Sequence, residues 1–545
     1  MKEKYIIPAL LVMSAIVCIT GFRWGLPSPA LNKLYFSGGP AIEERFKAAE
    51  SEKTGIPRSF YNPIRSYHPD EYFVIKSLQS IDPKELRLNS GQFAVGGAFL
   101  YLYGMVLLFL SGLGFIRLTG NILFYFLNPR EIARFYIAGR MLCILYATGT
   151  VLLTYLLAKK IWQSKTAGFL SAALLLFSPV FILNSHYMYV DIPGTFWIML
   201  TLYLAVKFLR DERSIPFVMG LTSGMAAGNK ITFVLSFFIP LAAFAISAKR
   251  TGEKFREGLY ALSGFLAALI LTNPFIFVSF QQLFRGPGQH ATGLSFTPLF
   301  YICSLRYGLG LPLLLFLSVG SVIAFLKKDG QFRDKVLLAV WIIFFFALMS
   351  VLSLKFARYM LPIVPALAIF GTGAWFTTGG NRILRFSRNS LIVLMLLFTS
   401  ACGLSYERFF VQENVRTLAG KWIRENIPAG SSMGVTEVPW QFQMPLFDCA
   451  LYDVVVTGYD FAVAMEKNPD YFVLSSFQAP IPTYPLRLQK ERNDFWERFS
   501  NSGMYKEKKV FRKVPSFFGM TFKKDVLPED LIYLNPTIVI FEKES

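Results

Sequence analysis

The sequence predicts a polytopic α-helical membrane protein with a small C-terminal α/β domain. Of its 545 residues, 54% are hydrophobic and only 17% are charged, and the mean hydropathy is +0.44, far from soluble-protein usage. Many windows of about 18 nearly uncharged residues are long enough to cross about 30 Å of hydrocarbon. Only the stretch from 406 to 545 instead alternates strand-like and helix-like runs, which is typical of an α/β domain.

The basic residues indicate which side of the membrane each loop occupies. The net charge of +20 would suggest nucleic acid in a soluble protein, but most Lys and Arg lie in short clusters between apolar segments. Such clusters are held in the cytoplasm. We therefore expect a lipid bilayer and no nucleic acid as partner. The five scattered cysteines do not suggest a disulfide framework.

The first apolar segment, 5–21, follows Lys2 and Lys4, so the N-terminus is expected in the cytoplasm. No small-x-small cleavage site follows it, and we interpret it as a retained anchor. Placing every basic cluster inside gives eleven crossings and a C-terminal region outside. The crossings are 5–21, 132–158, 166–183, 192–209, 215–229, 231–248, 257–280, 299–326, 336–354, 359–378 and 390–405.

Residues 93–116 are apolar enough to span, but parity argues against it. If Lys159 and Lys160 are cytoplasmic, segment 132–158 runs inward, so 93–116 must begin and end outside. We predict an interfacial or re-entrant helix there. The resulting division is a transmembrane domain, 1–405, and an extracytoplasmic α/β domain, 406–545.

Within the C-terminal region the periodicity predicts individual elements. The helix-like runs are 412–426 and 484–500, and the strand-like runs are 431–436, 451–457, 471–475 and 536–541.

Two adjacent carboxylates stand in the first outer loop, 22–92. Asp70 and Glu71 follow a His-Pro corner, and Pro69 suits the first turn of a helix. The carboxylates would then lie at a helix N-terminus, which favours negative charge. The amphipathic run 72–78 that follows is expected to lie on the membrane surface.

The predicted topology gathers further polar residues on the same outer face. Ionisable residues at the ends of membrane helices are costly unless paired or hydrated, so this collection indicates a functional site. Its members are Asp70, Glu71, His186, Asp191, Lys230, Arg285, His290, Arg358 and Tyr359.

Four motifs, in this order, resemble those of the GT-C superfamily of membrane glycosyltransferases, and most of all the protein O-mannosyltransferase-like group, family 39, with its relatives that include aminoarabinose transferase. They are His68-Pro69-Asp70-Glu71, Ser185-His186 followed by Asp191, Gly220-x3-Gly224-x3-Gly228-Asn229-Lys230, and Arg358-Tyr359-x-Leu361-Pro362. The resemblance covers residues 1–405. It implies two outer-loop helices before the second crossing, in agreement with the interpretation of 93–116.

The resemblance also implies an activity: inverting transfer of a hexose or pentose from a polyprenyl-phosphate donor to an acceptor hydroxyl, at the outer face of the cytoplasmic membrane. Such transfer needs a base at the acceptor and positive charge at the departing phosphate. Asp70 is the base that the resemblance implies, and Glu71 would orient Asp70 or the acceptor. Arg358 with Tyr359, and Lys230, would bind the donor phosphate, because a planar guanidinium suits two oxygens.

The other outer residues have less specific roles. Asp191, before Pro193, is either the N-cap of the next crossing or a second acid that binds acceptor or metal. His186 is more readily a hydrogen-bonding residue than a catalyst, and His290 stands in a Gly-rich loop that could close as a lid. No ligand spacing is diagnostic of a metal, although Asp70 and Asp191 with a His could hold a divalent ion.

Structural alternatives accompany each assignment. Asp70 and Glu71 could simply cap an interfacial helix, Lys230 could snorkel to the headgroups, and Arg358 could anchor at the interface. The three glycines of the Lys230 motif are expected to permit close helix packing. Two other functions stay open. A transporter or flippase of lipid-linked saccharide should show repeats and midplane charges, and a receptor-like protein would act through its C-terminal domain and dispense with Asp70.

Overall fold

The computed structural model describes most of the chain and divides it into two compact units. The described residues are 3–36, 42–45, 62–82, 85, 87–91, 95–212, 215–276, 296–327, 329–352, 355–377, 381–486, 489–522 and 524–544. The first unit comprises 1–20, 73–106 and 139–407, and the second comprises 21–72, 107–138 and 408–545. The second unit thus joins the C-terminal region to two earlier segments, and the functional division at 405/406 stays a prediction.

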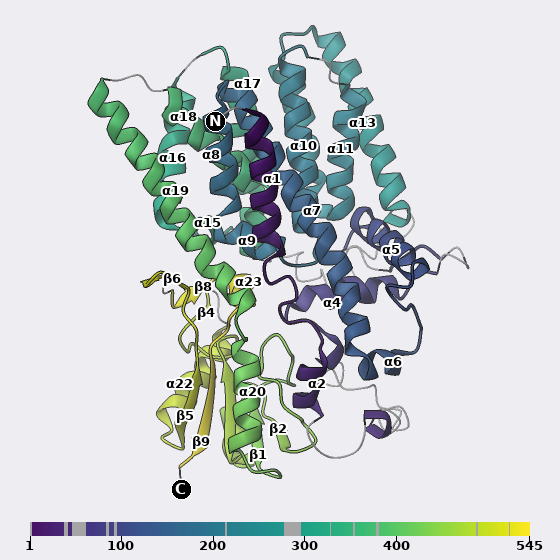
Figure 1. Cartoon of the computed structure of the whole chain (residues 1–545), viewed down its shortest axis with the longest axis vertical. Coiled ribbons are helices and arrows are strands. Elements are labelled where there is room, and N and C mark those ends of the chain that lie inside the picture. Colours follow the sequence, from purple (N-terminus) through teal and green to yellow (C-terminus); the bar gives the residue numbers. More distant parts are fainter. Residues whose placement is uncertain are drawn as a thin grey trace. The chain divides into compact units, whose positions relative to one another are not determined.

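Helices lie among the described residues of each predicted crossing (Figure 1). Those of the first unit, or shared by the two units, are α1 Glu3–Ile19, α4 Pro69–Leu78, α5 Gly97–Gly112, α7 Pro129–Trp162, α8 Lys165–Leu176, α9 Pro179–Ser185, α10 Asp191–Leu209, α11 Pro216–Asn229, η2 Ile231–Phe237, α12 Phe238–Ile246, α13 Thr251–Thr272, η3 Pro274–Ile276, α15 Pro298–Leu309, α16 Leu311–Leu326, α17 Phe332–Val351, η5 Ala357–Met360, α18 Val364–Thr377 and α19 Arg382–Val411.

Length and hydropathy mark several of these helices as membrane spans. Within the described ranges, five helical stretches are long and apolar enough to cross, and seven if each of two bent pairs is one span. The five are Pro129–Trp162, Asp191–Leu209, Thr251–Thr272, Phe332–Val351 and Arg382–Asn426. The polytopic helical class is confirmed, whereas the total of eleven crossings stays a prediction. Helix α5 has 16 residues, roughly 24 Å, and its interfacial placement stays a prediction.

Two predicted crossings are broken rather than continuous. Segment 299–326 forms α15 and α16, which meet at an angle of 112°. Gly310 stands at the break with φ +85° and Pro312 follows it, so the backbone turns where glycine permits a positive φ and proline starts a new helix. Segment 166–183 likewise forms α8 and α9, bent by 66° before Pro179. The sequence analysis treated each segment as a single crossing and did not predict either break.

Helices α10, α11 and α13 run side by side in the first unit (Figure 1). A Cβ atom on Gly220 would lie 1.7 Å from the carbonyl oxygen of Ala261, and one on Gly224 would lie 2.5 Å from that of Phe265. In return, a Cβ on Gly264 of α13 would lie 2.0 Å from the carbonyl oxygen of Phe217. The glycines therefore allow the two backbones to touch, as the small-residue spacing predicted.

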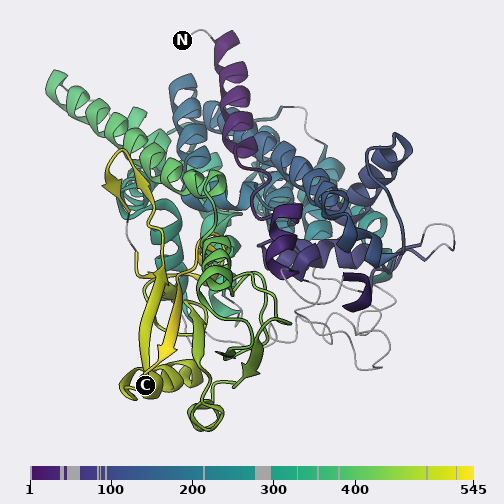
Figure 2. The same cartoon turned by 60° about the horizontal axis from the view of Figure 1, so that its bottom comes forward.

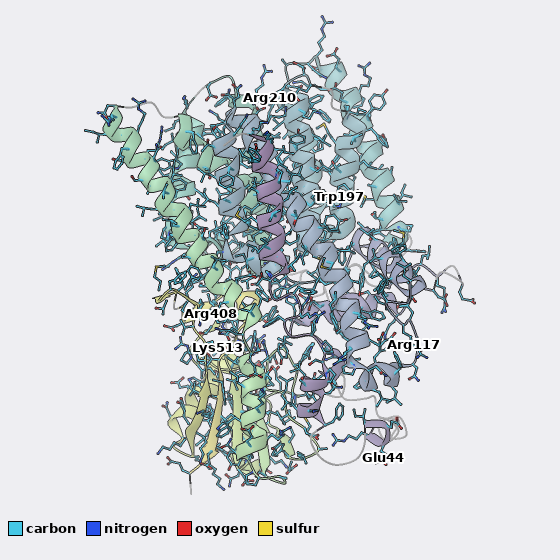
Figure 3. All side chains as sticks on the ribbon, viewed as in Figure 1. Glu44, Arg117, Trp197, Arg210, Arg408 and Lys513 are labelled. Carbon is cyan, nitrogen blue, oxygen red and sulfur yellow. The ribbon has the colours of Figure 1, made fainter. Side chains whose placement is uncertain are left out.

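The two ends of α10 carry different ion pairs. Asp191 begins the helix, and Arg210 follows its last residue, at the top in Figure 3, where Nη2 lies 2.7 Å from Asp334 Oδ2. Lys249 and Glu257 also pair at predicted inner positions. A helix of 19 residues separates the two ends by roughly 28 Å, close to the thickness of the hydrocarbon. The Arg210–Asp334 pair, which is predicted to be inside, therefore lies at the opposite end of α10 from Asp191.

The second unit contains a five-stranded mixed sheet in the order β2-β1-β3-β9-β5 (Figures 1 and 2). Strand β1 pairs in parallel with β2 and β3, and β9 pairs antiparallel with β3 and β5. The elements of this unit are α2 Pro29–Tyr35, α6 Ile122–Leu127, α20 Val415–Asn426, β1 Ser432–Val435, β2 Asp453–Val456, α21 Phe461–Lys467, β3 Tyr471–Ser475, β4 Tyr484–Pro485, α22 Lys490–Asn501, β5 Tyr505–Phe511, β6 Ser516–Phe517, β7 Met520–Thr521, β8 Val526–Leu527, α23 Glu529–Ile532 and β9 Ile538–Lys543.

Apolar cores cover both faces of this sheet. Ala419 and Ile423 of α20 pack with Met433 and Ile540 on one face, while Phe499 of α22 packs in the cluster of the other. The predicted α/β class is therefore confirmed, and so are its predicted elements except the start of the helix at 484–500, where the structure has the short strand β4 and a helix only from Lys490. The sequence analysis missed β5, which is a lysine-rich and largely exposed strand at the edge of the sheet. Edge strands commonly carry lysine, so β5 lacks the apolar alternation by which strands are recognised.

Candidate active site

Asp70 and Glu71 lie in the first turn of a helix, as the sequence predicted. Helix α4 begins at Pro69, and Asp70 and Glu71 occupy its first turn. Glu71 is fully buried, and its Oε2 accepts a hydrogen bond from Ser66 Oγ at 2.6 Å. Asp70 is half-buried. The two acids therefore differ: Glu71 is fully buried, whereas Asp70 is only partly buried.

The loop that carries this pair is attached to the C-terminal region, all within the second unit. Gln441 Nε2 donates to the carbonyl oxygen of Ser66 at 3.0 Å, and Asn62 Nδ2 donates to that of Pro439 at 3.0 Å. The Tyr67 hydroxyl lies 2.6 Å from Thr417 Oγ1. The Arg416 guanidinium lies over the Tyr67 ring, 5.2 Å from the ring centre. The residues just before Asp70 thus take their conformation from the C-terminal region.

In the first unit, Asp191 contacts two cations. Lys230 Nζ donates to Asp191 Oδ1 at 2.8 Å, and Arg358 Nε lies 3.5 Å from Asp191 Oδ2. Lys230 ends α11, and Arg358 lies in the short helix η5, so three separate elements meet here. The relative exposures of the three residues are 2%, 9% and 5%. Buried charges at helix ends require this kind of pairing.

Aromatic rings border the two cations. Lys230 Nζ lies 4.1 Å from the centre of the Tyr359 ring, and the Arg358 guanidinium lies 4.3 Å from that of Phe356 and 5.4 Å from that of Tyr189. Ring faces attract cations electrostatically. Two buried cations on one carboxylate are a suitable arrangement for a phosphate, because charges attract strongly in a site of low dielectric constant.

His186 makes hydrogen bonds within the helical unit. Its Nδ1 lies 2.7 Å from the carbonyl oxygen of Ile182, and its Nε2 lies 2.9 Å from that of Thr20 and 3.2 Å from Glu407 Oε1. The ring is fully buried. These contacts support the hydrogen-bonding role that the sequence favoured over catalysis.

The structure brings together four of the predicted site residues: Asp191, Lys230, Arg358 and Tyr359. Asp70 and Glu71 belong to the other unit, so one site that contains all six stays a prediction. Arg285 and His290, with the predicted lid, lie outside the described residues. Among the described residues, no group of three or more His, Cys, Asp or Glu could hold a metal ion, so the proposed divalent ion gains no support from their grouping.

Sequence reasoning missed three contributors. Tyr189 and Phe356 stand next to predicted residues, yet aromatic residues are too common in apolar segments to be recognised as ring contacts. Ser66, five residues before Glu71, carries no motif of its own. A hydroxyl within a turn of a buried carboxylate is a usable signal in retrospect, because a buried carboxylate needs donors.

Comparison with known proteins supports the predicted family resemblance. Residues 110–283 match the family model described as dolichyl-phosphate-mannose-protein mannosyltransferase. This segment contains the whole of α10 and α11, with Asp191 and Lys230. The predicted resemblance to the O-mannosyltransferase-like group is therefore confirmed over this segment, and the apolar helices of the described residues make the protein a multi-pass membrane protein.

Individual relatives are similar at a distance. An uncharacterized protein of Aquifex aeolicus is 26% identical over 269 residues, which covers 47% of this chain and 52% of that protein. The undecaprenyl phosphate-alpha-4-amino-4-deoxy-L-arabinose arabinosyl transferase 1 of Pseudomonas fluorescens is 27% identical over 244 residues, 40% of this chain and 42% of that protein. The match spans about half the length of these relatives. The solved ArnT of Cupriavidus metallidurans bound to undecaprenyl phosphate covers 99% of this chain and 98% of its own, at 11% identity and a TM-score of 0.46.

Proposed function

We propose that this protein transfers a sugar from a polyprenyl-phosphate-linked donor to an acceptor, with inversion, at the outer face of the cytoplasmic membrane. The observation that carries the proposal is the buried trio in which Lys230 and Arg358 share the carboxylate of Asp191. Two cations among aromatic rings suit a phosphate that gains charge as its bond to the sugar breaks. The family match over 110–283 and the arabinosyl transferase relative support the same donor class.

The chain's residues then have distinct roles. Arg358 and Lys230 bind the donor phosphate, Tyr359 flanks Lys230, and Asp191 holds the two cations in position. Asp70 accepts the proton of the acceptor hydroxyl as that oxygen attacks the anomeric carbon. Glu71 stays buried with Ser66 and supports Asp70 through the backbone of α4. A base of this kind contributes about 10² to 10⁴ in rate.

The test uses the purified full chain with synthetic polyprenyl-phosphate-linked pentoses and hexoses. Membrane lipids and proteins together serve as acceptor, and release of free polyprenyl phosphate is the readout. Asp70→Asn is expected to lower turnover by about 10² to 10⁴, and Arg358→Ala by about 10² to 10³ in kcat. Asp82→Asn, which alters an exposed acid beyond α4, is the matched control and should retain activity.

Undiminished turnover in Asp70→Asn would eliminate the proposed base. If the wild type moves the donor across vesicle bilayers without releasing polyprenyl phosphate, the alternative of a flippase replaces the transferase. The two ion pairs of α10 favour the transferase, because they lie at the ends of this helix, whereas a transporter is expected to hold such charges near the middle.

A further inference from the structure

The short hairpin β6–β7 in the second unit presents apolar side chains to solvent. Ser516 pairs with Thr521 and Phe517 with Met520, so Phe518 and Gly519 form the turn. Phe518 is 88% exposed and Met520 is 52% exposed. The hairpin stands apart from the five-stranded sheet in both Figure 1 and Figure 2. Single exposed apolar residues are common, but here two of them occupy one projecting tip.

The turn itself adds a second observation. Both turn residues have positive φ, +44° at Phe518 and +79° at Gly519. Two-residue hairpins with positive φ at both positions favour Asn-Gly or Asp-Gly, and a bulky residue there is disfavoured. Phe518 is therefore unfavourable in two respects: its backbone has a positive φ, and its apolar ring is exposed to solvent. Its ring lies 4.6 Å from that of Phe517, which leaves most of its surface uncovered.

Basic residues flank the tip on both sides. Arg512 and Lys513 precede the hairpin, and Lys523 and Lys524 follow it. Asp525 offsets part of this charge through its ion pair with Arg512 at 2.8 Å, and the segment stays positive. Aromatic tips with basic flanks are the composition of elements that lie in the headgroup region of a bilayer.

The hairpin is also attached close to where the chain leaves the predicted membrane. Arg408 Nη1 donates to Ser516 Oγ at 3.3 Å, and Arg408 lies in the last turn of α19. It stands three residues beyond the predicted end of the crossing at 405, which is roughly 4.5 Å of helix. A tip held at this depth lies within reach of lipid headgroups.

We propose that the β6–β7 hairpin docks the C-terminal α/β domain on anionic phospholipid headgroups, with Phe518 and Met520 inserted and the net positive charge of the flanking segments facing the lipid phosphates. The partner is the bilayer, because the basic flanks complement anionic lipid and the tip is tied to the end of a membrane helix. This docking goes beyond sugar transfer and does not depend on it.

A nitroxide at Met520→Cys, in a Cys303→Ser/Cys449→Ser background, tests the docking in the full chain. The protein is reconstituted into bilayers of phosphatidylcholine with and without phosphatidylglycerol. With the anionic lipid, the label is expected to be severalfold more accessible to oxygen than to a water-soluble nickel complex. The matched control is Val456→Cys, 47% exposed on the edge strand β2, which should remain accessible to the nickel complex in both bilayers.

A second variant separates insertion from folding. Phe518→Asn suits the positive φ of the turn, so it should keep or raise the unfolding temperature while it shifts the label at 520 towards water. Nickel accessibility at 520 equal to that at 456 in both bilayers overturns the proposal. So does protection at 520 that appears only when a soluble protein or a second copy of the chain is added, since a protein would then be the occupant.

Discussion

At the residue scale, Asp191 shows how one carboxylate fixes two buried cations. Lys230 and Arg358 come from elements far apart in the sequence, and each faces a different oxygen of Asp191. Removal of one member of a buried ion pair leaves an uncompensated charge, which costs more than the pair contributes. Asp191 is therefore expected to matter for stability as well as for donor binding.

A double-mutant cycle tests this sharing of charge. Asp191→Asn is expected to lower the free energy of unfolding by about 3 to 5 kcal/mol, because two buried cations lose their counter-ion. Lys230→Met in that background should restore part of the loss, a coupling of about 0.5 to 3 kcal/mol. Thermal and denaturant unfolding of the detergent-solubilised chain measure both. Strictly additive effects would show that the ion pair contributes nothing.

At the scale of elements, the glycines of α13 differ in how closely α11 approaches them. A Cβ on Gly264 of α13 would collide with the carbonyl oxygen of Phe217, whereas one on Gly258 of the same helix meets nothing within 4 Å. The same substitution should therefore have opposite signs at the two positions.

Gly264→Ala is expected to destabilise the protein by about 1 to 3 kcal/mol, because the backbones must separate. Gly258→Ala should stabilise it by about 0.5 to 1 kcal/mol, since alanine loses less backbone entropy in a helix interior. The unfolding temperatures of the two variants and the wild type decide the matter. Equal effects at both positions would contradict the close contact of α11 with α13.

The attachment of the Asp70 loop to the C-terminal region makes a kinetic prediction at the same scale. Gln441→Ala removes the hydrogen bond to the carbonyl oxygen of Ser66, so the loop should hold Asp70 less well for catalysis. We expect a lower kcat with an unchanged KM for the donor, measured on the folded fraction. Gln443→Ala, which removes a similarly buried glutamine of the same segment, is the control. A change in donor KM alone would argue against a positioning role.

At the scale of the whole molecule, membrane topology is the prediction with the widest consequences. Ala450 is exposed in the C-terminal region, and Gly252 is exposed at the start of α13. In a Cys449→Ser background, Ala450→Cys should react with an impermeant maleimide in sealed right-side-out vesicles. Gly252→Cys should react only after permeabilisation. The reverse pattern would place the C-terminal domain in the cytoplasm and remove the predicted common face of Asp70 and Asp191.

The C-terminal domain should also show an acid-dependent loss of stability. Hydrogen bonds from the Ser432 backbone N–H, and then from its hydroxyl, hold the pKa of Asp470 below its usual range. A lowered folded-state pKa stabilises the fold above the unfolded value, near 4, and this contribution disappears as the pH falls through the folded value. Asp470→Asn should therefore unfold at a lower temperature than wild type at pH 7, with the gap closing below about pH 4. A gap independent of pH would contradict this account.

Elements with a clear pattern of apolar residues were predicted from the sequence, and elements without one were not. The helical runs and the strands β1, β2, β3 and β9 were predicted because apolar periodicity reports burial locally. The breaks at Gly310 and Ser178, and the exposed edge strand β5, escaped because hydropathy windows average over them. Among the candidate site residues, motifs predicted Asp70 and Arg358, whereas Ser66 belongs to no motif.

The sequence by itself determined the membrane class, the α/β character of the C-terminal region, the helix start at Pro69 and the identities of the charged residues at helix ends. These features depend on local periodicity and on transfer free energies, which each segment carries alone. Only the tertiary structure decided that Lys230 and Arg358 share Asp191, and that Gln441 and Thr417 hold the loop before Asp70. Such contacts join residues hundreds of positions apart, and packing in three dimensions selects them.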